Sequence, residues 1–429
     1  MAADPSRADG SPAPGTAAAA GFRCRFCDAA LEHSMVDLGL SPLCEDFIRP
    51  EELRTPERYY PLEAFVCTRC WLVQVDEFAG NDEIFDADYG YFSSFSTSWL
   101  RHAARYVEMA CERFALGPEA FVVEIASNDG YLLRNFVERG VPCLGIDPSG
   151  NVAAAAREAG VDTRVDFFTE ALAREVLASR GPADLVVANN VLAHTPRLMD
   201  FVRGIAALVA PEGRATFEFP HLLNLIEQVQ FDTIYHEHFS YFSLHTVREI
   251  FRSVGMEIVD VEELPTHGGS LRLFVEHAAK GTAPSDAIAR VLAAEADAGL
   301  RELSTYLEFG ARAARVKDEL LKLLIRLKEE GARVAGYGAP GKGNTLLNYC
   351  GIKPDLLPYT CDMSVHKHGR HTPGSRIPIF PPSRIDEERP DYIVILPWNL
   401  AKEITAQLAH AREWGARFVV PVPTATVLD

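Results

Sequence analysis

The chain has 429 residues, of which 48% are hydrophobic and 24% charged, as in an ordinary globular protein. Its net charge of −18 argues against nucleic-acid binding, for which a basic surface is expected. No apolar run approaches the roughly 20 residues of a membrane-spanning helix, so a membrane protein is not expected either.

Residues 1–20 are rich in Ala, Pro, Ser and Gly, and this composition predicts a disordered tail. The tail contains Asp4, Arg7 and Asp9 and lacks the apolar stretch of a secretory signal. We therefore expect the protein in the cytoplasm, where cysteines stay reduced.

Residues 21–85 are predicted to form a small zinc-binding domain. Two Cys-x2-Cys pairs occur in it: Cys24 with Cys27, and Cys67 with Cys70. Two such pairs complete a closed tetrahedral site of four thiolates, which predicts a structural Zn²⁺. Cys44, in the loop between the pairs, is an alternative ligand. A redox role for Cys-x-x-Cys competes with zinc, but two pairs in one short region disfavour it.

Residues 86–280 are predicted to form a Rossmann-like domain. An aromatic and polar run at residues 88–95 precedes a helical pattern at residues 97–115, and we interpret the run as a lid or a partly buried connector. Beyond it, short apolar runs typical of buried parallel strands alternate with helical segments. The strands are expected at residues 121–125, 143–148, 184–190 and 214–219. This alternation is typical of a doubly wound sheet.

The ends of these strands predict a site for a methyl donor, because ligands of such sheets bind at the carboxyl ends of the strands. An acid at Asp147, after the second strand, suits the ribose hydroxyls of an adenosine. The first turn lacks G-x-G-x-x-G, so an adenosine ligand without phosphates, S-adenosylmethionine, fits better than a dinucleotide. The predicted contacts are Glu124, Ala126, Asn128, Gly130, Asp147, Asn189 and Asn190.

The most informative stretch of the chain contains four adjacent polar residues: Tyr235, His236, Glu237 and His238. Most of them exchange protons near neutral pH, and no apolar periodicity explains them as core residues. A histidine-rich surface loop is the alternative. The combination indicates proton abstraction next to a carbonyl, with a histidine as base and a tyrosine or glutamate to orient it. His194, which follows the strand at 184–190, is expected in the same crevice as the ligand turn that begins at Glu124, unless it is a capping or core histidine.

Residues 281–429 are predicted to form a second, smaller Rossmann-like domain. A long packing helix is expected at residues 285–330, followed by strands at 333–338, 392–396 and 417–420. The turn at residues 336–341 fits G-x-G-x-x-G and leads into the lysine at position 342.

This glycine turn predicts a cradle for a diphosphate, made by backbone amides and a helix N-terminus. Gly343 stands where a P-loop needs Ser or Thr, so a nucleotide triphosphatase is rejected. Asp362, about 20 residues further on, stands where a dinucleotide site has an acidic residue, so NAD binding remains an alternative. Arg272 follows a Gly-Gly pair at the start of a strand and would serve either a phosphate or a surface ion pair.

These motifs together resemble the S-adenosylmethionine-dependent C-methyltransferases that act on nucleotide-linked 4-keto-deoxy sugars. The resemblance covers residues 22–429. It rests on the four paired cysteines, the turn at 124–130, the segment at 189–194, the Tyr-His-Glu-His-Phe-Ser-Tyr-Phe motif at 235–242, and the glycine turn with its helix at 336–348.

The resemblance implies a zinc-binding domain, a methyl-donor domain, and a C-terminal domain that helps to hold the nucleotide sugar between them. It also implies that His238 is the catalytic base, assisted by Tyr235, Glu237 and His194, and that Tyr89 closes over the sugar. We expect a monomer whose substrate is a dTDP-linked 4-keto-deoxy sugar. The predicted substrate contacts are Tyr91, His236, Arg272, Tyr337, Gly338, Ala339, Lys342 and Asn344.

A ketone makes the reaction feasible, because the carbanion formed beside it is an enolate whose oxygen can be stabilised by hydrogen bonds. C3 and C5 both flank the C4 ketone, and the resemblance favours C3. A sugar O-methyltransferase and an NAD-dependent sugar-nucleotide oxidoreductase are the rival enzymes. A zinc-dependent scaffold without activity is the third alternative, and the intact cluster at residues 235–238 speaks against it.

Overall fold

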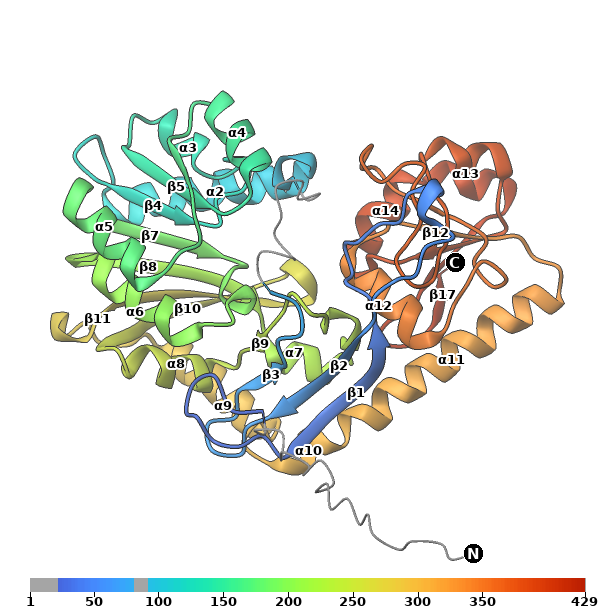
Figure 1. Cartoon of the computed structure of the whole chain (residues 1–429), viewed down its shortest axis with the longest axis horizontal. Helices are drawn as coiled ribbons and strands as arrows, with labels where there is room; N and C mark the ends of the chain where they lie inside the picture. Colours follow the sequence, from blue (N-terminus) through green and yellow to red (C-terminus); the bar gives the residue numbers. More distant parts are fainter. Residues whose placement is uncertain (1–21, 81–91, 429) are drawn as a thin grey trace, which may run out of the picture.

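The computed structural model describes residues 22–80 and 92–428. The predicted tail at 1–20 and the predicted site residues Tyr89 and Tyr91 lie outside this part of the chain. Within the described part there are three β-sheets, and Figure 1 shows the smallest of them lying between two larger α/β bodies.

The smallest sheet is antiparallel and belongs mainly to the predicted zinc-binding region. Its strands, in spatial order, are β1 (His33–Ser41), β2 (Tyr60–Val66), β3 (Val73–Val75) and β9 (Ser240–Tyr241). The last of these comes from the histidine-rich stretch and pairs with β3 through Val73 and Tyr241. The N-terminal module is therefore completed by the segment predicted to be catalytic.

The second sheet has seven strands in the order β10-β11-β8-β7-β4-β5-β6. The five strands β4 to β8 run parallel, while β10 and β11 are antiparallel additions at one edge. This doubly wound sheet confirms the predicted Rossmann-like domain. The strand bounds are β4 (Val122–Ile125), β5 (Cys143–Asp147), β6 (Thr163–Val165), β7 (Ala183–Asn189), β8 (Val209–Pro220), β10 (Met256–Leu264) and β11 (Ser270–His277).

Helices cover this sheet and supply its core, which explains why its central strands are apolar on both faces. The helix predicted at 97–115 is present, and Ser96 caps it by accepting a hydrogen bond from the Trp99 amide at 3.2 Å. These helices are α2 (Thr97–Phe114), α3 (Arg134–Val137), α4 (Gly150–Glu158), α5 (Glu170–Arg180), α6 (Leu198–Leu208) and α8 (Leu244–Arg252), whereas α7 (Leu222–Glu227) packs into the core that the N-terminal sheet shares with the C-terminal domain.

The long helix predicted at 285–330 is instead three helices: α9 (Asp286–Asp297), α10 (Leu303–Leu307) and α11 (Phe309–Glu329). The first break follows α9 at Gly299, whose φ of +73° is incompatible with a continuing helix. The leucine stripe on α11, including Leu320, Leu324 and Leu327, is buried as expected for a packing helix.

The third sheet has six strands in the order β14-β13-β12-β15-β16-β17 and is parallel except for β17. It confirms the second Rossmann-like domain. Its strands are β12 (Val334–Tyr337), β13 (Thr360–Cys361), β14 (Ile379–Phe380), β15 (Tyr392–Ile395), β16 (Arg417–Val420) and β17 (Thr426–Leu428), and its helices are α12 (Gly341–Cys350), α13 (Ser383–Glu388) and α14 (Ala401–Gln407).

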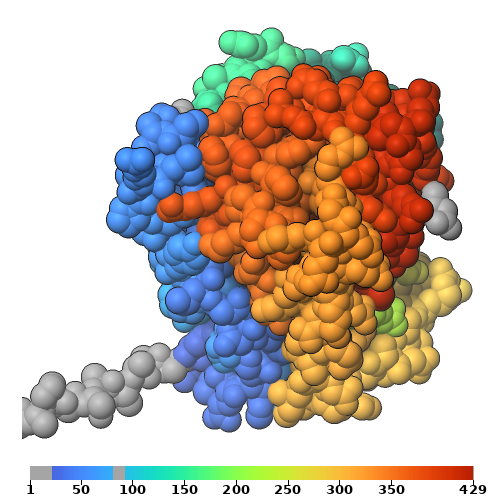
Figure 2. All heavy atoms as spheres, turned by 90° about the vertical axis from the view of Figure 1, so that its right-hand side faces the viewer, coloured from blue at the N-terminus to red at the C-terminus, as the bar shows by residue number. Residues whose placement is uncertain are grey.

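One hydrophobic core joins the N-terminal sheet to the C-terminal domain. Val36, Leu62, Phe309 and Leu346 are buried in the same cluster, and β1 packs against α10, α11 and α12. Figure 2 shows the blue N-terminal module and the orange C-terminal region in contact over a continuous face. Among the helices of residues 22–80 and 92–428, none is long and apolar enough to cross a membrane.

Candidate active site

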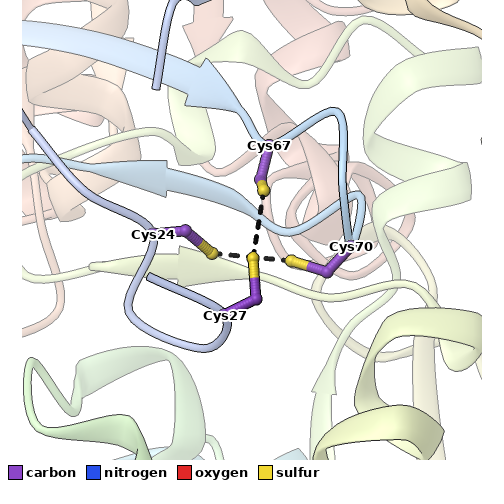
Figure 3. Close-up of side chains that lie close together, drawn as sticks. All are labelled: Cys24, Cys27, Cys67 and Cys70. Atoms are coloured by element: carbon purple, nitrogen blue, oxygen red, sulfur yellow. Dashed lines mark hydrogen bonds between the residues drawn. The ribbon is translucent and has the colours of Figure 1, made fainter. Parts of the chain in front are cut away.

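The four paired cysteines converge on one point, as Figure 3 shows. Their sulfur atoms lie within 4.8 Å of one another, with 3.5 Å between Cys24 and Cys70 and 3.5 Å between Cys27 and Cys67. Four free thiols at this spacing suit a tetrahedral Zn²⁺, whose Zn–S bonds of about 2.3 Å separate the sulfurs by slightly less than 4 Å. Cys44 is not part of the cluster, so the alternative ligand is excluded. A closed set of four thiolates makes the zinc structural.

The zinc-binding loop holds the histidine-rich stretch in place. Arg25, between the first two ligands, donates a hydrogen bond from Nη1 to the carbonyl oxygen of Phe239 at 2.9 Å. The backbone amide of Val75 donates to the same oxygen at 3.1 Å. Both contacts come from the zinc-binding module and reach the residue that directly follows His238.

A cleft with a volume of about 1820 Å³ lies between the three domains. This volume exceeds the 300–1,000 Å³ of an ordinary single-ligand pocket, so there is room for two ligands side by side. The predicted site residues that line it are Ala126, Asn128, Asp147, Asn189, Asn190, His194, Tyr235, Glu237, His238, Arg272, Tyr337, Gly338 and Lys342.

The side of the cleft predicted to bind the methyl donor is formed by the ends of β4, β5 and β7. The Asp147 carboxylate accepts backbone hydrogen bonds at 2.9 Å from Asn128 and at 2.9 Å from Ser149, and burial raises its pKa to about 6. The Oδ1 atoms of Asn189 and Asn190 are buried and have no hydrogen-bond partner within the described residues. The two amide oxygens suit hydrogen bonds from the amino groups of S-adenosylmethionine. The Asp147 carboxylate, which lines the cleft beside them, suits the hydroxyls of its ribose.

The backbone of this region is strained where it meets the cleft. Ala126, Asn128 and Asn190 have φ values of +56°, +48° and +54°, a region that residues other than glycine rarely adopt. Such conformations cost of the order of 1–3 kcal/mol each and persist at functional sites because their surroundings hold them.

Two predicted donor contacts lie behind the loop and do not line the cleft. Glu124 is fully buried, and burial together with Asp147 raises the pKa of its carboxyl. Gly130 has a φ of +75°, and a Cβ atom there would lie 2.9 Å from Cγ2 of Val161. Gly130 therefore permits close packing of the turn on its neighbours. Direct contact of either residue with the donor stays a prediction.

His238 is oriented as a base. Its Nδ1 atom lies 2.8 Å from the carbonyl oxygen of Thr233, which can only accept, so Nδ1 carries the proton and Nε2 keeps a free lone pair. The ring centroid lies 4.0 Å from that of Tyr235 and 4.7 Å from that of His194. Burial lowers the pKa of His238 well below 6.5 and that of His194 to about 4, so both rings are neutral at physiological pH.

Glu237 faces a group of residues that the sequence did not identify as part of the site. Its Oε1 atom accepts a hydrogen bond from the Cys44 thiol at 3.4 Å. Burial raises the pKa of Glu237 to about 8, and the nearby Glu45 adds to this rise. Lys367 lies 3.4 Å from Glu45. No local pattern signals this cluster, because its members come from distant parts of the chain.

Two predicted substrate contacts have protein partners instead. The Arg272 guanidinium binds Glu218 at 2.8 Å and Glu262 at 2.8 Å, so its charge is already compensated. His236 points away from the cleft, with Nε2 lying 3.1 Å from the carbonyl oxygen of Pro61.

The glycine turn differs from the predicted diphosphate cradle. The backbone amide of Ala339 donates to the carboxylate of Asp362 at 2.6 Å. At Gly341, the first residue of α12, a Cβ atom would lie 3.2 Å from Oε1 of Glu45, so this carboxylate stands against the start of the helix. Two internal carboxylates thus lie where a pyrophosphate would bind, which disfavours the NAD alternative.

The remaining predicted contacts of the C-terminal domain divide into two groups. Asn344 is buried and donates to the carbonyl oxygen of Cys44 at 2.6 Å, so it fastens α12 to the N-terminal module. Tyr337 and Lys342 line the cleft, where the Tyr337 hydroxyl accepts a hydrogen bond from Gln407 at 2.9 Å.

Protein-family profiles match three consecutive parts of the chain. They are described as a putative zinc binding domain, a methyltransferase domain and a C-methyltransferase C-terminal domain, and they cover residues 24–85, 99–261 and 265–423.

Among characterised relatives, C-methyltransferase NovU of Streptomyces niveus is 37% identical over 406 residues, which are 95% of this chain and 96% of that protein. A ubiquinone biosynthesis O-methyltransferase of Rhodopseudomonas palustris is 24% identical over 30% of this chain and 58% of its own length. A solved S-adenosylmethionine-dependent methyltransferase of Anabaena variabilis aligns with 41% of this chain and 84% of its own, at 15% identity and a TM-score of 0.33.

Full-length similarity at this identity shows the class: the chain belongs to the S-adenosylmethionine-dependent C-methyltransferase family. The protein is an enzyme that transfers the methyl group of S-adenosylmethionine to carbon and that carries a zinc-binding domain. The predicted enzyme class, methyl donor and metal are confirmed.

Proposed function

We propose that the enzyme methylates a dTDP-linked 4-keto-deoxy sugar at the carbon next to the ketone. C3 is favoured on the resemblance, and C5 is the alternative. The observation that carries this proposal is the neutral His238 imidazole, whose Nδ1 is bound to the carbonyl oxygen of Thr233 and which lines the same cleft as the loop proposed to bind the methyl donor. The product would be a branched deoxysugar of a natural product, made in the cytoplasm by a monomeric enzyme.

The chemistry requires a base that is neutral and shielded from water. His238 takes the proton from the carbon beside the ketone; the electron pair of the broken C–H bond forms a C=C bond, and the carbonyl π pair moves onto oxygen to give an enolate. Tyr235 and His194 flank the imidazole and fix its orientation. S-adenosylmethionine, when bound, supplies an electrophilic methyl group and leaves as a neutral thioether.

A ketone is needed because an ordinary sugar C–H is far too weak an acid for an imidazole whose normal pKa is about 6.5. Burial makes His238 a weaker base still. Holding substrate and donor together in one cleft supplies part of the missing rate. An O-methyltransferase would need a base but no ketone, so substrate structure separates the two functions.

The test is mass spectrometry of dTDP-4-keto-6-deoxy and 2,6-dideoxy sugars incubated with S-adenosylmethionine in deuterated water. We expect the sugar to gain one methyl group, and we expect deuterium exchange at the carbon beside the ketone, which locates the methylated position. Methylation of a hydroxyl in a sugar without a ketone would establish the O-methyltransferase instead. Binding of NAD without binding of S-adenosylmethionine would establish the oxidoreductase.

A further inference from the structure

Lys342 lies in the cleft but not in a phosphate cradle. It is the second residue of α12, directly after the glycine turn, where Asp362 accepts a hydrogen bond from the Ala339 amide and the Glu45 carboxylate lies against Gly341. Its Nζ atom donates to Oδ1 of Asn399 at 3.1 Å and lies 4.8 Å from the centre of the Trp398 ring. A diphosphate bound at the glycine turn would be repelled by two carboxylates. The position of Lys342 directly after this turn is therefore no evidence that it binds phosphate.

The charge of Lys342 is less compensated than that of the other buried cations of the cleft. Lys367 lies 3.4 Å from Glu45 and donates to the Ala339 carbonyl, while Arg272 binds two glutamates. Among residues 22–80 and 92–428, the hydrogen-bond partner of Lys342 is a neutral amide, which leaves two N–H groups of its ammonium for a ligand. Burial lowers the pKa of its amine, and the charge of Asp232 opposes this shift.

Two residues that are adjacent in the chain, Asp232 and Thr233, lie beside Lys342 and His238 respectively. Asp232 accepts a hydrogen bond at 2.6 Å from the indole of Trp398, the ring on which Lys342 rests. The next residue, Thr233, holds Nδ1 of His238. Burial and His194 lower the pKa of His238, and Lys342 contributes to the same shift because its charge is close enough to repel a protonated ring. The cation and the base are therefore held by one short segment, residues 232–233.

We propose that Lys342 is a further catalytic residue, which stabilises the negative oxygen of the enolate instead of binding the diphosphate. The inference rests on the proposed function, because it requires a ketone beside the methylated carbon. As His238 removes the proton, the C–H electron pair forms a C=C bond and the carbonyl π pair moves onto oxygen. The Lys342 ammonium donates a hydrogen bond to that oxygen. When the carbon gains the methyl group, the carbonyl re-forms and Lys342 keeps all its protons.

The test compares Lys342→Gln, which removes the charge, with Lys342→Arg, which retains it. Three quantities are measured on the zinc-loaded full chain: the dissociation constant of dTDP, the deuterium exchange of the keto sugar with S-adenosylhomocysteine present, and kcat for methyl transfer. Lys322→Gln, on the exposed side of α11, is the matched control and is expected to leave all three unchanged. Asp232→Asn combined with Lys342→Gln also neutralises the buried carboxylate whose pKa the Lys342 charge lowers, so a folding defect of the single variant can be separated from a loss of catalysis.

We expect Lys342→Gln and the double variant to lose about 10²- to 10³-fold in exchange and in kcat, as when an oxyanion-stabilising donor is removed, while dTDP binds within a factor of about three. We expect Lys342→Arg to recover part of the exchange. If dTDP affinity falls at least tenfold while kcat at saturation is retained, Lys342 binds phosphate and the inference is overturned. Undiminished exchange in the variants overturns it as well. A wild-type enzyme that exchanges no proton of any keto sugar would overturn the proposed function and this role together.

Discussion

The thiol of Cys44 lies 3.4 Å from Oε1 of Glu237, although 193 residues separate the two in the chain. Burial raises the pKa of Cys44, so the thiol keeps its proton and donates it to the glutamate. The next residue, Glu45, helps to hold the pKa of Glu237 near 8. The N-terminal module therefore influences the protonation state of a carboxyl in the catalytic segment.

We predict that Glu237→Gln retains methyl transfer at pH 7 to within about tenfold of the wild type. A carboxyl with a pKa of about 8 is protonated at pH 7, and glutamine has nearly the same shape as the protonated acid. The wild-type rate should fall above pH 8 as the carboxyl ionises, and the variant should lack this decline. The measurement is a pH profile of kcat for both proteins. A loss in Glu237→Gln as large as that in a His238 variant would show that the ionised form is needed.

His238→Gln is expected to reduce kcat by about 10²- to 10⁴-fold, the usual contribution of a general base. The affinity for S-adenosylmethionine should change less than about threefold, because the donor side is built from β4, β5 and β7. Calorimetric titration and steady-state kinetics measure the two effects. For the wild type, the acid limb of kcat/KM should lie below pH 6, since burial holds the pKa of His238 well below 6.5. Unchanged turnover in the variant would remove His238 from the mechanism.

Removal of zinc by a chelator, or by Cys24→Ser, should abolish methyl transfer without abolishing binding of S-adenosylmethionine. The metal fixes the loop from which Arg25 reaches the carbonyl oxygen of Phe239, next to the base. The donor side receives no contribution from this loop. Metal content, activity and donor affinity are measured on the same preparation. Full activity in a zinc-free protein would show that the catalytic segment keeps its position without the module.

His267 offers a test of pH-dependent stability. Burial lowers its pKa to about 4, from about 6.5 in the unfolded chain, so the folded state binds fewer protons between these values. The free energy of unfolding should therefore fall as the pH drops from about 6.5 towards 4. We choose His267→Asn because asparagine tolerates the φ of +54° at this position. When the pH is lowered from 7.5 to 5.0, the free energy of unfolding, measured by urea denaturation, should fall in both proteins. The fall should be smaller in the variant than in the wild type by up to about 2 kcal/mol. An equal fall in the free energy of unfolding in the two proteins would contradict a buried, neutral His267 ring.

Much of the fold and part of the site follow from local sequence patterns. The apolar run at 121–125 became β4, and the four paired cysteines converged as their spacing predicts. His194 lines the same cleft as Ala126 and Asn128 of the ligand turn, as its position after the strand at 184–190 predicts.

Contacts between distant segments could not be derived in this way. Nothing near Glu45 in the chain indicates that its carboxylate lies against the first residue of α12, about 300 residues later, beside a fingerprint turn. Similarly, Arg272 resembles a free cation in the sequence, because its partner Glu218 lies on a neighbouring strand and has no fixed spacing from it.

The pairing of β3 with β9 has a consequence for the order in which the protein folds during synthesis. β3 ends at residue 75 and β9 begins at residue 240, so the sheet that contains them cannot close until 165 further residues have been made. At about 5–20 residues per second, this takes roughly 8–33 seconds. The zinc ligands are synthesised before β9, but the edge of β3 stays unpaired until the methyltransferase domain supplies that strand. The N-terminal sheet is thus completed only after most of the methyltransferase domain has been made.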